Sequence, residues 1–378
     1  MEKAGLNSAD YWESADVDIR LNPKRSIDDS GLNEFLTEDC GIEAAVVMAT
    51  SGTSGGFKFA VLPKKALLNS AGRVIGHCGL TGEDVWLAGL SGFHVGGLGI
   101  YARAYMAGSR LVDFPGHWER DGRRLVSVIE ENGATLTSMT PTHLHDLVSH
   151  GMKAPSSLRG LLLGGGKMEP ILVDRARQLG WPVWPSYGMT EACSQIATST
   201  DGSIDHLPVL EGWELRTDGE ERLAIRGESL FAGYAIKESA GWRFDEARDG
   251  EGWFVTGDRC VLEKGILQFR GRVDDLVKVS GELVSISRLN SLAGRIAHDH
   301  GMDVAVVAVP DERRENSLVL VVEASRSGGR EMLSWINAEL DPIERIGRAV
   351  SVEKLPRTEI GKLDRDTLQS EAMAALDN

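Results

Sequence analysis

The chain has 378 residues, of which 42% are hydrophobic, and its formal net charge is −15. The length exceeds that of a typical single domain and indicates two or three units. So acidic a surface disfavours a nucleic-acid partner, because binding to phosphate backbones needs clustered lysines and arginines.

The first forty residues are polar and acidic and show weak periodicity. The apolar run Ala44–Ala49 then stops at a Thr/Ser/Gly cluster, which predicts a buried strand leading into a loop. After this loop, residues Lys58–Leu62 predict a second strand. Pro63 suits the first turn of a helix, which we expect over Lys64–His77.

Short apolar runs and helical patterns alternate over the next hundred residues. The predicted strands are Val85–Ala88, Arg110–Val112, Ala134–Ser138 and Leu161–Leu163. The predicted helices are Leu98–Ala107, Arg120–Glu131, Thr142–His150 and Pro170–Leu179. The alternation predicts an α/β fold with mostly parallel sheets flanked by helices.

The pattern changes after about Ile204. Short strands such as Trp213–Arg216 and Arg222–Ile225, separated by Gly and Asp turns, predict a small β-barrel-like subdomain over residues 204–270. A compact α+β unit follows, with predicted helices Ile286–Ala297 and Glu331–Leu340 and predicted strands Val304–Val309 and Leu318–Val322. We place the domain boundary at Asp274, which gives an N-terminal domain of residues 1–273 and a C-terminal domain of residues 274–378.

Cysteine spacing and apolar runs bear on the cellular setting. The four cysteines are far apart and form neither a metal-site pattern nor a disulfide framework, which indicates reduced thiols. The first residues lack the pattern of a signal peptide, and no apolar run approaches the roughly 18 residues of a membrane span. We therefore expect a cytoplasmic protein without a membrane partner.

Residues 50–58 form a loop of small and hydroxyl side chains that ends in Lys58. Small residues let backbone N–H groups approach an anion, and a lysine supplies a point charge for phosphate. Phe57 stands where a Walker A sequence needs glycine, and a plain surface turn explains the loop equally well. The loop also contains G-x-S-x-G around Ser54, the nucleophile elbow of hydrolases. That elbow needs a helix directly after the serine, whereas a strand is predicted here.

Three charged residues have spacings that suit chemistry on a nucleotide. Glu191 follows a tight glycine turn and could hold Mg²⁺ against phosphate oxygens, or could be a solvated residue at a helix N-terminus. Asp258 could accept both hydroxyls of a ribose, or could be an ordinary turn residue. Lys362 could stabilise charge while a carboxylate attacks the α-phosphate of ATP, or could be a surface lysine.

His94 and Gly97 lie in the segment Phe93–Leu98, before a predicted helix. They could line an acyl or aryl pocket, although a histidine at a helix N-terminus is commoner. The pairs His143/His145 and His298/His300 lack a further ligand cluster, so capping or surface histidines are expected rather than a metal site.

Five motifs in this order resemble the adenylate-forming family of AMP-forming acyl- and aryl-CoA ligases. They occupy residues 50–58, 187–191, 256–258, 271–275 and 355–365, and the resemblance runs from about Val46 to Arg365. It implies that ATP and a carboxylic acid form an acyl-adenylate and pyrophosphate, and that the thiol of CoA then displaces AMP. ATP, Mg²⁺ and the co-substrate CoA are therefore implied ligands.

The resemblance also implies a role for each matched residue. The β- and γ-phosphates of ATP are assigned to Thr50, Ser51, Gly52, Thr53, Ser54, Gly55 and Lys58. The nucleotide is further assigned to Gly164, Gly165, Gly166, Tyr187, Gly188, Asp258 and Arg272, the last two at the ribose. Thr190 and Glu191 lie at the adenylate, with Glu191 as the Mg²⁺ ligand, and Lys362 is the adenylation lysine. Asp274 is the hinge of a mobile C-terminal domain, and Ser280 and Gly281 line a CoA tunnel.

Within the family, the segments Phe93–Gly97, Gly164–Gly166 and Tyr187–Gln195 are most similar to the o-succinylbenzoate–CoA ligases of menaquinone biosynthesis. The expected pocket residues are His94, Gly97, Ser194 and Gln195, and Arg103 is a candidate partner for a second substrate carboxylate. Fewer residues precede Thr50 than is usual in the family, so we expect a shortened N-terminal subdomain. The alternatives are a CoA ligase for another aryl or acyl acid and a non-catalytic relative that binds a nucleotide or adenylate. A homodimer is the expected default if the chain associates.

Overall fold

The chain forms two units in a computed structural model. The structure describes residues 5–23, 27–51, 57–114, 122–166, 168–239, 241–280, 282–311, 313–323, 329–357 and 363–376. The large unit comprises Met1–Asp218, Leu223–Thr256 and Val261–Gln268, and the small unit comprises Gly219–Arg222, Gly257–Cys260 and Phe269–Asn378. The predicted boundary at Asp274 stays a prediction.

A six-stranded sheet with the order β5-β4-β6-β7-β8-β9 forms the centre of the large unit. Its strands are β4 (Val85–Ala88), β5 (Arg110–Asp113), β6 (Leu136–Met139), β7 (Gly160–Leu163), β8 (Val183–Met189) and β9 (Ser194–Thr198). All pairings are parallel except that of β8 with β9. Because parallel strands need crossover connections, helices alternate with them: α4 (Val95–Ala107), α5 (Arg123–Asn132), α6 (Pro141–Ser149) and α7 (Pro170–Gln178).

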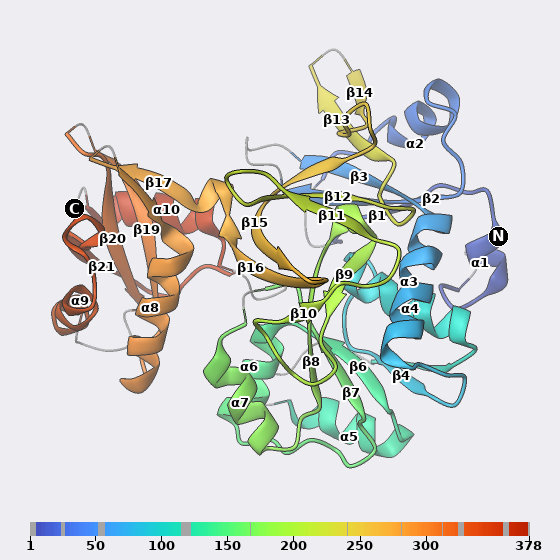
Figure 1. The fold of residues 1–378 in the computed structure, drawn as a ribbon, viewed down its shortest axis with the longest axis horizontal. Coiled ribbons are helices and arrows are strands. Elements are labelled where there is room, and N and C mark those ends of the chain that lie inside the picture. Colours follow the sequence, from blue (N-terminus) through green and yellow to red (C-terminus); the bar gives the residue numbers. More distant parts are fainter. Residues whose placement is uncertain are drawn as a thin grey trace. The chain divides into compact units, whose positions relative to one another are not determined.

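Helices cover both faces of this sheet (Figure 1). Leu87 of β4 lies in one buried cluster with residues of α5, α6 and α7. The neighbouring Trp86 points the other way, since its ring lies 4.9 Å from the guanidinium carbon of Arg103 in α4. Successive residues of a strand face opposite sides, so α4 covers the face away from α5, α6 and α7. The predicted mostly parallel sheet with flanking helices is therefore confirmed.

A second sheet of the large unit has the order β1-β2-β3-β13-β14. Its strands are β1 (Asp18–Arg20), β2 (Ala45–Ser51), β3 (Phe57–Pro63), β13 (Gly233–Glu238) and β14 (Gly241–Asp245). The β1–β2 pairing is parallel, and the others are antiparallel. Helix α3 (Lys64–Cys78) packs against β3 and β9 and so joins the two sheets (Figure 1).

The N-terminal segment folds onto this second sheet although its sequence shows weak periodicity. It contains α1 (Ala9–Glu13), β1, α2 (Leu32–Glu34) and the π-helical turn η1 (Phe35–Asp39). Leu32 and Leu36 are buried in a cluster with residues of β2 and β3. Lys64 is 1% exposed, and its ammonium donates to the carbonyl and hydroxyl oxygens of Ser14 at 3.1 and 2.8 Å. Tertiary contacts rather than local propensity therefore define this segment.

A hydrogen-bond network joins the amino ends of three parallel strands. The carboxylate of Asp84, just before β4, accepts bonds from the Arg159 guanidinium at 2.7 and 2.5 Å. It also accepts the Thr135 hydroxyl at 2.9 Å and the Thr81 amide at 2.9 Å. Thr135 precedes β6 and Arg159 precedes β7, so one buried carboxylate fixes the start of three strands.

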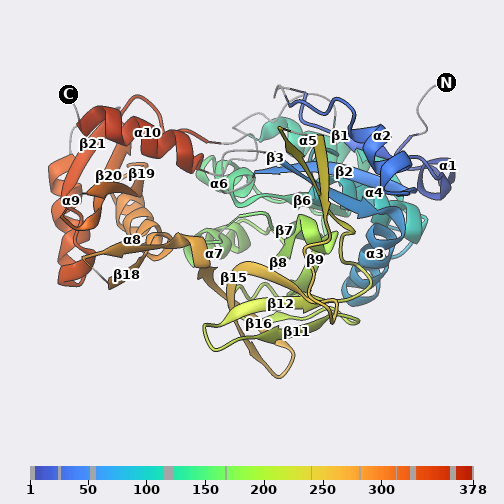
Figure 2. The same cartoon turned by 90° about the horizontal axis from the view of Figure 1, so that it is seen from above.

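A third sheet has the order β10-β16-β15-β12-β11 (Figure 2). Its strands are β10 (Leu207–Pro208), β11 (Glu214–Thr217), β12 (Arg222–Arg226), β15 (Phe254–Glu263) and β16 (Ile266–Arg272). Short strands were expected in this region, whereas the β-barrel-like subdomain predicted over residues 204–270 stays a prediction. The next two strands do not join this sheet: β13 pairs with β3 in the second sheet, and β14 pairs with β13.

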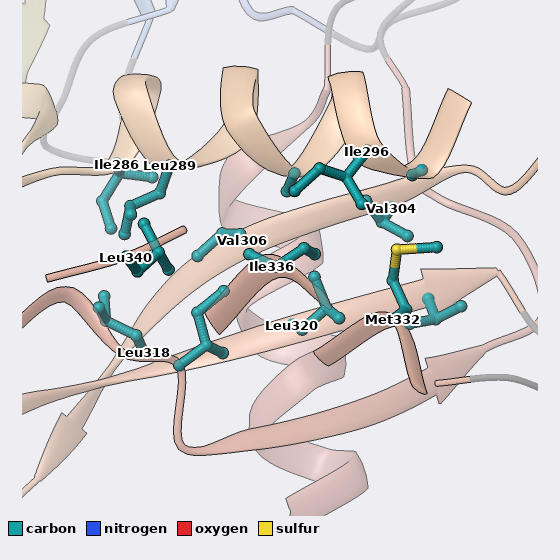
Figure 3. Close-up of a cluster of buried hydrophobic side chains, with 14 of the residues drawn as sticks. Ile286, Leu289, Ile296, Val304, Val306, Leu318, Leu320, Met332, Ile336 and Leu340 are labelled. Carbon is teal, nitrogen blue, oxygen red and sulfur yellow. The ribbon is translucent and has the colours of Figure 1, made fainter. Parts of the chain in front are cut away.

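The small unit is an α+β unit built on β19 (Val304–Asp311), β20 (Glu315–Glu323) and β21 (Arg348–Val352). Its other elements are η3 (Val273–Asp275), β17 (Leu276–Val279), β18 (Glu282–Ser285), α8 (Ile286–Asp299), α9 (Gly329–Ala338), η4 (Pro342–Glu344) and α10 (Arg365–Leu376). Figure 3 shows Leu289 and Ile296 of α8 packed with Ile336 of α9 and Leu320 of β20. The opposite face of the sheet packs against Leu368 of α10.

The outer surface of α9 carries Trp335, which is 40% exposed. Its ring stacks on that of His300, the residue after α8, at a centroid distance of 3.9 Å. Within the described part of the chain, no helix has the length and hydropathy needed to cross a membrane.

Candidate functional site

The predicted nucleotide motifs lie at the carboxyl ends of β7 and β8. Gly164–Gly166 follow β7, whereas Tyr187 and Gly188 are among the last three residues of β8 (Val183–Met189). Ligands of parallel sheets bind beyond such strand ends. Gly164 permits close approach of the two strands, because a Cβ there would lie 2.7 Å from the Ser186 hydroxyl oxygen.

The connection from β8 to β9 is a tight antiparallel turn around the short helix η2 (Thr190–Ala192). A Cβ on Gly188 would lie 1.9 Å from the backbone oxygen of Ser194. Cys193 and Ser194 have φ of 51° and 127°, which residues with side chains rarely adopt. Strained backbone conformations of this kind are often found at functional sites, and here they follow Thr190 and Glu191 closely in the same turn.

Glu191 is held by the segment that leads into β13. The Tyr234 hydroxyl donates to Glu191 Oε1 at 2.6 Å, and the Phe231 amide donates to the Glu191 backbone oxygen at 2.8 Å. The pairing of β13 with β3 puts Tyr234 opposite Ala60 and thus beside the predicted phosphate loop. No motif spacing indicated Tyr234, because the strand pairing alone brings it to this site.

Lys58 reaches the same tyrosine from the loop side. Its ammonium nitrogen lies 5.3 Å from the centroid of the Tyr234 ring. Thr50 is the strand partner of Lys58, and its hydroxyl donates to the Lys58 carbonyl at 3.2 Å. Ser51 ends β2, whereas Gly52, Thr53, Ser54 and Gly55 lie outside the described residues. Strand β3 rather than a helix follows the loop, which argues against a nucleophile elbow at Ser54.

The donor set around Glu191 fits a Mg²⁺ ion that is shared with a nucleotide. Tyr234 engages one carboxylate oxygen, and Oε2 accepts no hydrogen bond from the described residues. Among the described residues, neither this region nor any other contains a group of three or more His, Cys, Asp and Glu side chains that could hold a metal ion without further ligands. Mg²⁺ prefers oxygen ligands and usually takes one or two carboxylates together with substrate phosphates and water.

A buried polar cluster lies where α4 meets β9. Arg103 is 2% exposed and donates to Gln195 Oε1 at 3.2 Å and to the Ser138 hydroxyl at 3.5 Å. Gln195 in turn donates to the Thr198 hydroxyl at 2.8 Å. Gly99 lies between Arg103 and Ser194, since a Cβ there would meet Arg103 Nη1 at 3.0 Å and Ser194 Oγ at 3.4 Å. The structure thus brings together Arg103, Ser194 and Gln195, all three of which the sequence analysis named as candidate substrate-binding residues.

The charge of Arg103 has no acidic partner among the residues that the structure describes. Its Nε atom is buried without a hydrogen-bond partner. Burial lowers the pKa of Arg103 to about 10. A buried charge is costly unless it is paired, so this cluster favours an anionic group of a ligand.

His94 and Gly97 lie at the start of α4. His94 is the residue before the helix, and its ring centroid lies 4.8 Å from that of Phe93. A Cβ on Gly97 would lie 2.2 Å from the Ser91 backbone oxygen, so close packing of the preceding turn explains this glycine. Their role in a substrate pocket stays a prediction.

Asp258 and Arg272 form an ion pair within the small unit. Arg272 Nη1 lies 3.2 Å from Asp258 Oδ1, and Asp258 is 7% exposed. A Cβ on Gly257 would lie 2.9 Å from Arg272 Nη2, so the glycine gives the guanidinium room to approach. The two residues predicted to bind ribose are therefore neighbours.

The proposed hinge residue Asp274 belongs to the short helix η3. The next residue, Asp275, is 3% exposed and accepts hydrogen bonds from Ser287 and from Arg365, the first residue of α10. This contact ties η3 to the segment that follows the predicted adenylation lysine. Lys362 itself lies outside the described residues.

Ser280 is the residue after β17 and has a φ of 53°. Its amide donates to the Arg314 carbonyl at 2.8 Å, and Arg314 Nε donates to its hydroxyl at 3.2 Å. Gly281, the other residue predicted at the CoA tunnel, lies outside the described residues. The turn between β19 and β20 therefore supports the start of the predicted tunnel segment.

Comparison with known proteins identifies the family. The family model of the AMP-binding enzyme matches residues 16–234, and that of the AMP-binding enzyme C-terminal domain matches residues 296–362. The chain belongs to the AMP-binding enzyme family. The adenylate-forming resemblance and the fold class predicted from the sequence are thereby confirmed.

Similar AMP-binding enzymes include 2-succinylbenzoate–CoA ligases. That of Bacillus pumilus is 30% identical over 87% of this chain and 69% of the relative, and that of Salmonella typhimurium is 32% identical over 85% and 67%. Escherichia coli MenE with bound OSB-AMS superposes with a TM-score of 0.72 at 26% identity, covering 88% of this chain and 69% of that one. Bacillus subtilis o-succinylbenzoate CoA synthetase (MenE) in complex with ATP and magnesium gives 0.71 at 26% identity, covering 85% and 69%. The chain is an AMP-forming acid–CoA ligase.

Proposed function

We propose that this AMP-forming ligase uses ATP and Mg²⁺ to activate o-succinylbenzoate and transfers the acyl group to CoA. The observation that carries the substrate proposal is Arg103, a buried cation without an acidic partner in the described structure, beside Gln195. o-Succinylbenzoate has two carboxylates, so one can react while the other pairs with a buried guanidinium. The names of similar enzymes support the same acid.

In the proposed first step, a carboxylate oxygen of the acid attacks the α-phosphorus of ATP and pyrophosphate leaves. Lys58 supplies positive charge to the β- and γ-phosphates, and Asp258 binds the ribose hydroxyls. Glu191 holds Mg²⁺, which neutralises charge on the phosphate oxygens when it is bound. Lys362 stabilises the charge that develops at the α-phosphate.

In the proposed second step, the CoA sulfur attacks the acyl carbonyl carbon, and the bond to the AMP oxygen breaks. The thiol proton is lost to solvent, and the products are the CoA thioester and AMP. The small unit rotates about Asp274 between the steps, and Ser280 and Gly281 line the path of the CoA arm.

The test is ATP-dependent pyrophosphate release with o-succinylbenzoate, benzoate and a panel of fatty acids, with and without CoA. Release with o-succinylbenzoate and a CoA thioester of the matching mass would support the proposal. Release with a different acid would support the proposed adenylation chemistry but would contradict o-succinylbenzoate as the substrate. ATP binding without release for any acid would favour a non-catalytic relative.

A further inference from the structure

Tyr234 contacts both charged groups of the proposed phosphate and metal site, yet no motif assigns it a role. Its hydroxyl donates to Glu191 Oε1 at 2.6 Å, a short bond to a charged acceptor. Its ring centroid lies 5.3 Å from the Lys58 ammonium nitrogen, within the range of a cation–π interaction. One side chain therefore touches the carboxylate expected to hold the metal and the lysine expected to hold phosphate.

The fold fixes this tyrosine from outside the site. The Phe231 ring packs edge-on against the Tyr234 ring at a centroid distance of 4.7 Å, and Phe231 is fully buried. Gly233, with φ of 154°, allows β13 to approach β14, because a Cβ there would lie 2.4 Å from the Asp245 backbone oxygen. The ring position is therefore determined by packing and strand pairing rather than by Glu191 or Lys58.

This contact also keeps the two charges apart. Lys58 and Glu191 converge on the tyrosine, but no ion pair joins them within the described residues. A direct ion pair would neutralise both groups and would have to break before Mg²⁺ and phosphate could bind. The hydroxyl engages Oε1 and leaves Oε2 for a metal, while the ring face supports the ammonium group.

We propose that Tyr234 is a positioning residue that orients Glu191 toward Mg²⁺ and seats Lys58 for the phosphates of ATP. The inference rests on the proposed function for the identity of the ligand. Removing a partner that orients a metal ligand typically costs about 10- to 100-fold in metal affinity. The hydroxyl and the ring make separate contacts, so substitutions can remove them one at a time.

The experiment measures equilibrium binding of ATP by titration calorimetry, once with Mg²⁺ and once with EDTA. Tyr234→Phe keeps the ring and should weaken Mg²⁺–ATP binding about 10-fold while leaving metal-free ATP binding unchanged. Tyr234→Leu also removes the ring face and should weaken metal-free ATP binding as well. The matched control is Tyr105→Phe, which removes a tyrosine–carboxylate bond of 3.1 Å to Glu13 on the surface and should change neither value.

The Mg²⁺ concentration that gives half-maximal pyrophosphate release should rise by a similar factor in Tyr234→Phe. Equal weakening with and without Mg²⁺ would show a merely structural role and would overturn the proposal. Unchanged binding by Tyr234→Phe would overturn it too, while leaving the proposed function intact. If the unmodified protein failed to bind ATP at all, the proposed function would fail together with this inference.

Discussion

Arg103 brings a positive charge into the interior of the large unit, where the described residues offer it neutral acceptors. Replacing a buried charge with an apolar side chain of similar volume is often neutral or stabilising by about 1–4 kcal/mol. We therefore expect Arg103→Met to raise the free energy of unfolding by about 1 kcal/mol. The same change should raise the KM for o-succinylbenzoate about 30-fold or more, since the loss of one partner of a buried charge pair costs about 2–5 kcal/mol.

Urea unfolding and initial-rate kinetics on the same preparation would measure both effects. A less stable variant with an unchanged KM would contradict the assignment and make Arg103 a structural residue. Benzoate, which lacks the second carboxylate, serves as the control substrate, and its KM should change little.

A substitution of Gly188 would show whether the turn around Glu191 has room for a side chain at this position. In Gly188→Ala, the new Cβ would meet the Ser194 backbone oxygen, which can move away only if the turn opens. Such overpacking costs about 1–3 kcal/mol, so we expect a lower free energy of unfolding and weaker Mg²⁺–ATP binding. Gly76→Ala on α3 is the control, because its Cβ meets no atom within 4 Å and alanine favours helix. Equal stability of the two variants would show that the turn is more tolerant than its geometry indicates.

Strand and helix prediction succeeded where the local pattern and the tertiary environment agree. Strand β4 has the predicted bounds Val85–Ala88, and α7 begins at the predicted Pro170. Helix α4 begins at Val95 rather than at the predicted Leu98. Its first turn contains Gly96 and Gly97, and the low helix propensity of glycine made this turn look non-helical in the sequence. Strand β4 is an apolar run between Asp84 and Gly89, and α7 has a proline in its first turn and Gly180 just after its end, so the local sequence marks both elements.

Prediction failed where distant partners determine the structure. The N-terminal segment is ordered by contacts such as that of Lys64 with Ser14, which are far apart in the sequence. Tyr234 could not be found for the same reason, since the β3–β13 pairing brings it to Glu191. By contrast, Arg103 and Gln195 were both named as candidates, and the structure brings them into contact.

The network around Asp84 makes the amino ends of β4, β6 and β7 sensitive to pH. Burial alone raises the pKa of Asp84, but hydrogen bonds from Arg159, Thr81 and Thr135 outweigh it and lower the pKa below its ordinary value. A lowered folded-state pKa stabilises the fold above the unfolded pKa of about 4, and this stabilisation disappears as the pH falls through the lower folded value.

Asp84→Asn should therefore lower the free energy of unfolding by about 2 kcal/mol at pH 7, the usual size for hydrogen bonds to a charged group. The difference from the unmodified protein should shrink as the pH falls below about 4. Urea unfolding between pH 7 and pH 3 measures this directly. A difference that stays constant over that range would show that the charge of Asp84 does not matter.

The proposed two-step reaction uses residues of both units. Glu191 and Lys58 belong to the large unit, whereas Asp258, Arg272 and Lys362 belong to the small one. Lys362→Ala should slow adenylation by about 10²- to 10³-fold, because it removes a charge aimed at the transition state. Thioester formation from preformed acyl-adenylate should stay within about twofold of the unmodified rate, since in the proposed mechanism that step uses a different pose of the small unit.

Single-turnover measurements of each half-reaction would separate the two effects. Equal slowing of both half-reactions would contradict the proposal that the small unit takes a different pose in each of them. Tyr105→Phe is again a suitable control, because the hydroxyl that it removes donates to Glu13 rather than to a proposed site residue, and it should leave both half-reactions unaltered.

The stacking of Trp335 on His300 gives the small unit an optical signal of its own. The chain has nine tryptophans, and Trp335 is the only one in the sequence of the small unit. Trp335 is 40% exposed and stacked on an imidazole, so we expect its emission to differ from that of buried indoles such as Trp86 and Trp181. Subtracting the fluorescence of Trp335→Phe from that of the unmodified protein would isolate this emission. Stopped-flow recording of the difference would then show, without any attached dye, whether the proposed rotation of the small unit changes the surroundings of Trp335.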